Sequence, residues 1–139
     1  MEQQRVVLIT GTSSGIGLAT RRELQGRGWR VFGSARRPDG ADPDVLALDV
    51  TDQGSVEAAV ATVLERAGRI DAVVNNAGID IEGAVEETTV EEGQALFATN
   101  LFGVHRVIRE VLPHLRAQGA GRIVVTSSLA AHMPIPFDA

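Results

Sequence analysis

Several residue types are absent from this 139-residue sequence, and each absence excludes a class of chemistry. Without cysteine, the chain cannot form disulfides, use thiolate catalysis or build cysteine-based metal sites. Tyrosine and lysine are also missing, so that all 13 basic residues are arginine. A reaction that needs a phenol or an amine must therefore take it from outside these residues. The lack of cysteine is compatible with a cytoplasmic protein, which is the location we expect.

A basic surface field is absent as well. The formal net charge is -5 and the isoelectric point is about 5.1, so we expect neither nucleic acid nor a membrane surface as a partner. No apolar stretch reaches the length that spans a bilayer, and the polar start of the chain does not resemble a signal peptide. With 44% hydrophobic residues, the length predicts one domain over residues 1–139.

Short apolar segments alternate with helical patterns along the chain. The predicted strands are residues 6–9, 29–35, 45–48, 70–74 and 122–126, and the predicted helices are residues 16–27, 53–67 and 90–118. The strand segments are apolar along most of their length, which is typical of strands buried on both faces. This alternation predicts the α/β class, with a doubly wound parallel sheet and helices on both faces.

Proline and glycine refine this pattern at two places. Residues 36–44 contain Pro38, Gly40 and Pro43 and are too few for a crossover helix, so we expect a loop with at most one helical turn. Pro113 is expected to bend the longest helix or to lie in its last turns.

A glycine-rich turn, Thr-Gly-Thr-Ser-Ser-Gly-Ile-Gly, occupies residues 10–17 between the first predicted strand and the first predicted helix. Glycine at 11, 15 and 17 lets the backbone turn tightly and approach a pyrophosphate, with the free N–H groups of the helix N-terminus facing it. The spacing is neither G-x-G-x-x-G nor a P-loop, which needs Lys before Ser or Thr. The alternative is a purely steric turn, but the strand before it and the helix after it favour nucleotide binding.

Four further motifs follow in chain order. They are Asp49-Val50, Asn75-Asn76-Ala77-Gly78, Asn100 within Thr-Asn-Leu-Phe-Gly, and the segment from Gly121 to Ser128. In order and spacing, the five motifs resemble the short-chain dehydrogenase/reductase family. The resemblance implies a Rossmann-type fold and an NAD(P)-dependent oxidoreductase that transfers hydride between nicotinamide and a small-molecule carbonyl or secondary alcohol. The cofactor contacts that we assign by motif are Gly11, Ser13, Ser14, Gly15, Ile16, Gly17, Arg36, Asp49, Val50, Asn76, Ala77 and Gly78.

Cofactor choice depends on the end of the second predicted strand. An acidic residue there would accept hydrogen bonds from the adenosine ribose and repel a 2′-phosphate, but Ala35 is followed by Arg36 and Arg37. Because guanidinium pairs well with phosphate, NADP is favoured over NAD. The alternative is a solvated surface pair, and Ser14, where some NADP-preferring relatives carry a second basic residue, counts slightly against NADP.

Asp49 and the Asn76–Gly78 segment follow the third and fourth predicted strands. In similar enzymes the Asp49 carboxylate and the next backbone N–H hold the adenine. Asp49 could instead cap the following helix, although Thr51 and Asp52 are better placed to do so. The small residues up to Gly78 lie at the carboxyl edge of the sheet, where ligands bind in open α/β sheets, and they also suit a structural turn.

Two catalytic positions are implied by the resemblance. Asn100 ties a water into the proton relay, although an Asn within an apolar helical stripe could instead be a hydrogen-bonded packing or kink residue. Ser128 orients the substrate carbonyl, with Ser127 as the less favoured neighbour. The three histidines, His105, His114 and His132, do not form a ligand set, so no metal site is expected.

The sequence departs from the family in lacking the catalytic Tyr and the Lys four residues after it. That Lys and the nicotinamide lower the pKa of the Tyr, and by family spacing the Tyr falls just past Ala139. We therefore expect that the C-terminal part of the fold is missing, that the chain is inactive alone, and that a full-length form is a homo-oligomer. The alternative is a non-catalytic dinucleotide-binding sensor or scaffold.

Overall fold

The computed structural model describes residues 3–137 and contains one five-stranded sheet. Neighbouring strands pair in parallel in the order β3-β2-β1-β4-β5. The predicted doubly wound sheet is therefore confirmed, with strand ends that differ from the predicted ones by at most two residues. The strands are β1 (Val6–Ile9), β2 (Arg30–Ala35), β3 (Val45–Ala47), β4 (Ala72–Asn75) and β5 (Arg122–Val125).

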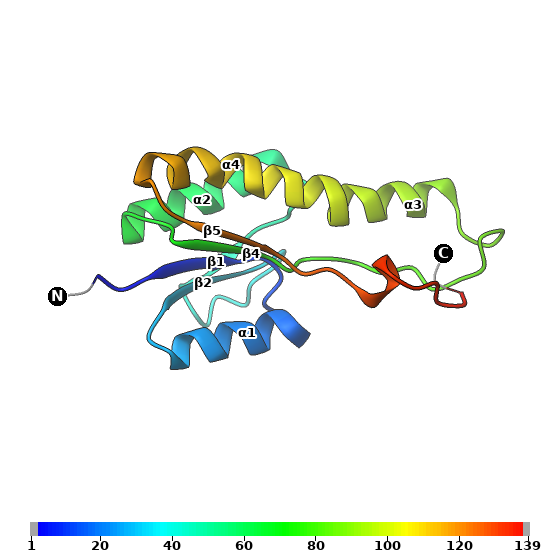
Figure 1. Ribbon diagram of the computed structural model, residues 1–139, viewed down its shortest axis with the longest axis horizontal. Coiled ribbons are helices and arrows are strands. Elements are labelled where there is room, and N and C mark those ends of the chain that lie inside the picture. The colour runs from blue at the N-terminus through cyan, green and yellow to red at the C-terminus, as the bar shows by residue number, and fades with distance from the viewer. Residues whose placement is uncertain (1–2, 138–139) are drawn as a thin grey trace.

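Helices cover both faces of the sheet. α1 (Gly15–Gly26) lies on one face, and α2 (Gln53–Ala67) and α4 (Val104–Gln118) lie on the other (Figure 1). The loop predicted between β2 and β3 is confirmed, because no helix occurs between these strands. No helix within residues 3–137 is long and apolar enough to cross a membrane.

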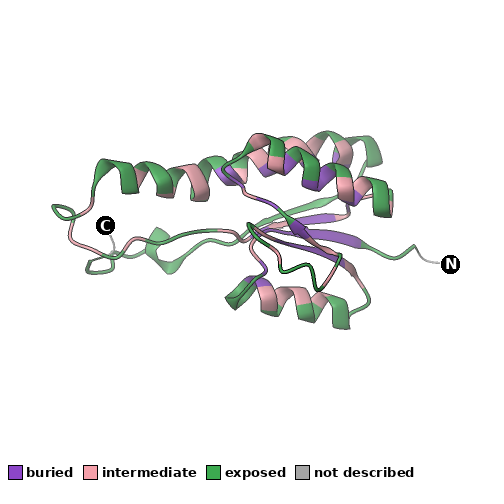
Figure 2. Ribbon diagram, turned by 180° about the vertical axis from the view of Figure 1, so that it is seen from behind, coloured by how far each residue is buried: buried purple, intermediate pink, exposed green. Residues whose placement is uncertain are grey.

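The apolar core has two parts, one on each face of the sheet, and β1 contributes to both because its side chains alternate between the faces. Val6 and Leu8 join the larger apolar cluster with residues of α2 and α4. Val7 and Ile9 join a smaller cluster on the α1 face. All four residues of β1 are buried, and the buried residues gather around the central strands (Figure 2).

The long predicted helix is present but interrupted. α3 (Val90–Phe97) and α4 are joined by a π-helical segment, Ala98–Gly103, which the sequence pattern did not indicate. Pro113 lies inside α4 in its last turns, which is the second of the two outcomes expected from the sequence. A Cβ on Gly103 would lie 2.6 Å from Val50 Cγ2, so this segment packs closely against the chain after β3. No residue of α3 is buried, and the helix extends beyond the sheet (Figures 1 and 2).

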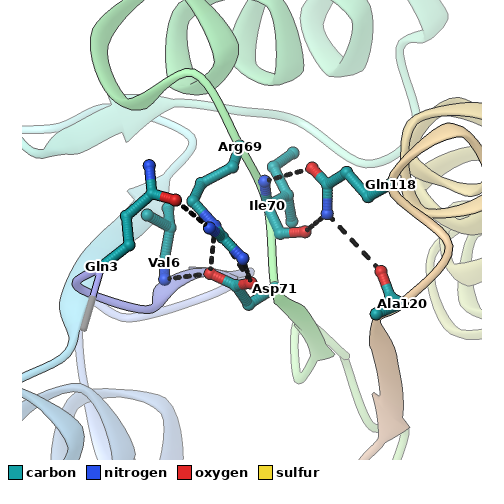
Figure 3. Close-up of polar contacts among 7 residues, drawn as sticks. All are labelled: Gln3, Val6, Arg69, Ile70, Asp71, Gln118 and Ala120. Carbon is teal, nitrogen blue, oxygen red and sulfur yellow. Dashed lines mark hydrogen bonds and ion pairs between the residues drawn. The ribbon is translucent and has the colours of Figure 1, made fainter. Parts of the chain in front are cut away.

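At the amino end of the sheet, polar side chains bond to one another and to the strand ends (Figure 3). Asp71 accepts a hydrogen bond from the Val6 N–H at 2.7 Å and forms an ion pair with Arg69, which also donates to Gln3. The Gln118 side chain accepts from Ile70 N at 3.1 Å and donates to Ile70 O at 2.7 Å. These contacts tie β1, β4 and the end of α4 together.

Candidate functional site

A groove opens at the carboxyl ends of the strands, where several predicted motifs meet. Its walls come from the glycine-rich turn, the end of β2, the chain after β3 and the chain after β4. All the cofactor contacts assigned by motif line it except Gly17. The lining residues are Gly11, Ser13, Ser14, Gly15, Ile16, Ala35, Arg36, Leu48, Asp49, Val50, Thr51, Asn76, Ala77, Gly78, Ile79, Thr99 and Thr126.

The three glycines of the turn serve different purposes. Gly17 is buried, and a Cβ there would lie 2.0 Å from Gly11 O, so it allows backbone to contact backbone. Gly11 has φ +70°, and a Cβ there would lie 2.9 Å from Ala77 Cα. Gly15 has φ +56°, but a Cβ there would meet nothing within 4 Å, and the residue lines the groove. The turn therefore leaves space at Gly15, where a ligand can approach the backbone.

The N-terminus of α1 differs from those of the next two helices. In α2, Asp52 caps the helix by accepting from the Ser55 N–H, and in α3 Thr89 and Glu92 form a capping box. Ser14, the N-cap of α1, makes no side-chain cap bond within the described chain. The N–H groups of this first turn and the positive end of the helix dipole therefore face the groove, an arrangement that suits an anion such as pyrophosphate.

A buried hydroxyl holds the two sides of the groove together. Thr10 Oγ1 accepts hydrogen bonds from the N–H groups of Asn76 and Ala77, each at 3.0 Å. In return, Asn76 Nδ2 donates to Gly11 O at 2.9 Å and to Thr10 O at 3.2 Å. The Asn76 side chain thus stabilises the glycine-rich turn, and Thr10 joins this turn to the segment after β4, a structural role that the sequence analysis did not assign. The signal for it was a threonine directly before the first glycine of the turn.

Asp49 lies at the adenosine end implied by the motif. Its Oδ1 accepts from Thr51 Oγ1 at 2.7 Å and from Thr51 N at 2.9 Å. These bonds, first the hydroxyl and then the N–H, lower the pKa of Asp49 against the opposing effect of burial, and Arg36 and Arg106 lower it further. The alternative in which Asp49 caps α2 is wrong, because Asp52 is the cap.

Arg36 and Arg37 lie beside this carboxylate. Both are exposed, and with Ser13, Ala35 and Asp49 they line a polar recess that adjoins the groove. Neither arginine forms an ion pair within the described residues. The recess therefore offers two guanidinium groups to an anionic ligand.

A second cavity continues from the groove and brings the two predicted catalytic positions together. Asn100 and Ser128 line it, with Met133 and Ile135 among its apolar residues. Asn100 Oδ1 accepts from Ile79 N at 2.9 Å, and its Nδ2 donates to Ile79 O at 2.8 Å. Ser128 Oγ accepts from Ala130 N at 3.2 Å and caps a short 3₁₀ turn, Leu129–Ala131. The Asn100 side chain is thus already bonded, whereas the Ser128 hydroxyl donates no hydrogen bond within residues 3–137.

Comparison with known proteins agrees with this geometry. The family model described as short chain dehydrogenase matches residues 5–139. A 3-ketodihydrosphingosine reductase of Bacteroides thetaiotaomicron is 40% identical over 138 residues, which are 98% of this chain and 51% of that protein. A crystal structure of a short-chain dehydrogenase from Streptomyces avermitilis is 39% identical, with a TM-score of 0.91 over 99% of this chain and 54% of that one.

Two other similar structures hold different nicotinamide dinucleotides. ElxO with NADP bound has a TM-score of 0.89 and 27% identity over 97% of this chain and 60% of that one. A 3-ketoacyl-(acyl-carrier-protein) reductase from Brucella melitensis, complexed with NADH, has a TM-score of 0.90 and 29% identity over 99% of this chain and 63% of that one. The chain spans about half the length of the curated relative it matches. Because the family model covers nearly the whole sequence, the chain belongs to the short-chain dehydrogenase family of oxidoreductases.

Proposed function

We propose that this chain forms the cofactor-binding part of an NADP(H)-dependent oxidoreductase that acts on a small-molecule carbonyl or secondary alcohol. The observation that carries the choice of NADP is the recess at the end of β2, where Arg36 and Arg37 lie with Ser13 and Asp49. Two guanidinium groups stabilise the double negative charge of a 2′-phosphate, whereas an acidic residue at Ala35 would repel it.

The groove offers separate sites for the pyrophosphate and for the adenine of the dinucleotide. The uncapped N-terminus of α1 binds the pyrophosphate, with Gly15 allowing close approach. Asp49 and the Val50 N–H hold the adenine. Both Thr51 bonds use Oδ1 of Asp49, so Oδ2 is the oxygen that accepts from the adenine amino group.

In the second cavity the chain orients the substrate. The bound nicotinamide supplies or accepts hydride, and the Ser128 hydroxyl donates a hydrogen bond to the substrate carbonyl. Because the Asn100 side chain is bonded to Ile79 in both directions, its backbone carbonyl holds the water of the proton relay. The π-helical segment around Asn100 supports this, because such segments interrupt the regular pattern of carbonyl bonding in a helix.

The 139 residues include no tyrosine and no lysine, so they do not supply the proton donor of the family. We therefore expect this chain alone to bind NADPH and not to oxidise it in the presence of carbonyl compounds. Steady NADPH oxidation by these 139 residues with any carbonyl substrate would contradict the expected inactivity.

The test of cofactor choice is Arg36→Asp, assayed by titration with NADPH and NADH. Since the carboxylate repels a 2′-phosphate and accepts from ribose hydroxyls, we expect NADPH affinity to fall on the order of 10- to 100-fold, and NADH affinity by less than about 3-fold. The control is Arg109→Asp, the same charge change at an exposed position of α4. An equal loss for both dinucleotides in Arg36→Asp would refute the assignment.

A further inference from the structure

The loop that carries Arg36 is held in place by contacts that the family motifs do not include. Within the described chain, residues 36–41 make no hydrogen bond or ion pair with another element, and the Asp39 carboxylate accepts only from the Ala41 N–H in the same loop. Asp42 is therefore the first residue after β2 whose side chain bonds to another element. It forms an ion pair with Arg21 of α1 and accepts from the Asp44 N–H at 2.9 Å.

Arg21 reaches Asp42 by lying over Gly33 of β2. A Cβ on Gly33 would lie 2.4 Å from Thr12 Oγ1, 3.0 Å from Arg21 Cδ and 3.2 Å from Arg21 Nε. The Arg21 side chain is only 12% exposed, and its buried Nε has no hydrogen-bond partner within residues 3–137. Within the described residues, Asp42 is the one carboxylate that pairs with this mostly buried guanidinium.

The far end of the loop is fixed separately, from the opposite face of the sheet. Arg66 of α2 donates to Pro43 O at 2.7 Å and lies 3.7 Å from an Asp44 carboxylate oxygen. The Gly33 N–H also donates to Asp44 O at 2.9 Å. Asp42 is joined to this end as well, because its carbonyl accepts from Val45 N at 3.0 Å. The backbone near β3 thus has contacts besides Arg21, whereas residues 36–41 are held through Ala35 at one end and Asp42 at the other.

We propose that the Arg21–Asp42 ion pair positions the loop of residues 36–44 so that Arg36 and Arg37 meet a 2′-phosphate. This inference rests on the proposed NADP(H) specificity and adds two positioning residues that line neither the groove nor the recess. Ordering the loop before the ligand arrives removes part of the entropic cost of binding.

For the variant Asp42→Ala, a simple effect of charge and a loss of loop positioning change phosphate binding in opposite directions, so this variant tests the proposal. Asp42→Ala removes a negative charge from the loop, so simple electrostatics predicts tighter binding of a phosphate. Loss of loop positioning predicts weaker binding. Asp39→Ala removes a carboxylate and one local hydrogen bond from the same loop, but it leaves the tie to α1 intact, so it is the matched control.

The experiment measures the affinities of the 139-residue chain for adenosine 2′,5′-bisphosphate and adenosine 5′-monophosphate by titration calorimetry. These probes differ only in the 2′-phosphate, and the ratio of their affinities within one variant does not depend on the folded fraction. We expect Asp42→Ala to reduce the preference for the bisphosphate on the order of 3- to 10-fold. Arg21→Met, which keeps an apolar stem over Gly33, should give the same loss, and the double variant should lose no more.

Arg22→Met, the same charge change at an exposed neighbour on α1, should leave the preference within about 2-fold. The proposal is overturned if Asp42→Ala strengthens the preference or behaves like Asp39→Ala. If the wild-type chain itself shows no preference for the bisphosphate, the NADP(H) assignment fails and this inference fails with it. A clear wild-type preference with unaffected variants overturns this inference alone.

Discussion

The two ends of the sheet are both polar, but they use their polar groups differently. At the amino end, side chains pair with one another and with strand termini, as with Asp71 and Val6 or Gln118 and Ile70 (Figure 3). At the carboxyl end, internal bonds such as that from Asn76 N to Thr10 Oγ1 hold two loops together beside an open groove. The N-terminus of α1 and the exposed Arg36 remain available there. One end therefore stabilises the fold, and the other end is organised to receive an anion.

This difference predicts that substitutions at the amino end lower stability without changing binding, whereas substitutions at the carboxyl end change dinucleotide binding by the folded protein. The largest effect is expected for Gly17→Ala, at the carboxyl end. Its methyl group would lie 2.0 Å from Gly11 O and 2.5 Å from Asn76 Nδ2, so the turn must move. We expect roughly 3 kcal/mol or more of lost stability, and loss of dinucleotide binding by the folded protein, measured by chemical denaturation and titration.

The matched control for this change is Gly26→Ala, at the other end of the same helix. A Cβ there meets nothing within 4 Å, and alanine favours a helix over glycine by up to about 1 kcal/mol. Binding should be unchanged and stability equal or greater. If Gly17→Ala binds dinucleotide normally, the close contact between the two loops does not shape the groove.

At the amino end, Asp71→Asn should lower stability by about 2 kcal/mol and leave dinucleotide affinity unchanged. Burial raises the pKa of Asp71, but the hydrogen bonds from Arg69 and the Val6 N–H outweigh it, so its folded-state pKa lies below the ordinary value. Its contribution is therefore complete above the unfolded pKa of about 3.9 and is lost as the pH falls through the folded pKa. Urea unfolding at neutral and acid pH measures this.

The control for Asp71 is the pH profile itself. The difference between wild type and Asp71→Asn should be largest near pH 7 and should shrink in acid, because the wild-type carboxyl then becomes neutral too. A constant difference from neutral to acid pH would show that the lost acceptor oxygen, and not the lost charge, destabilises Asp71→Asn.

The smallest effect is expected for Gln118→Ala, which removes both bonds to Ile70. Ile70 is fully buried, so its backbone groups lose partners that water replaces only in part. We expect a loss of about 1 kcal/mol in urea unfolding, again with unchanged dinucleotide affinity. A change in affinity here would break the separation between the two ends of the sheet.

Local patterns explain what could be predicted from the sequence. The strands and the glycine-rich turn could be assigned because apolar runs and glycine spacing are visible over a few residues. The π-helical segment could not, because it accompanies distant contacts, of Gly103 with Val50 and of Asn100 with Ile79. The buried bonds of Thr10 and the ion pair of Arg21 likewise depend on partners that only the fold brings close.

The central place of β1 also has a consequence for how the chain is made. β1 precedes both of its partner strands in the sequence, yet Val7 pairs with Val31 on one side and with Ala72 on the other. During synthesis, both edges of β1 can therefore be paired only after β4 has left the ribosome. The strand that is buried along its whole length in the folded protein is thus exposed until β4 emerges, and it needs shielding during that time.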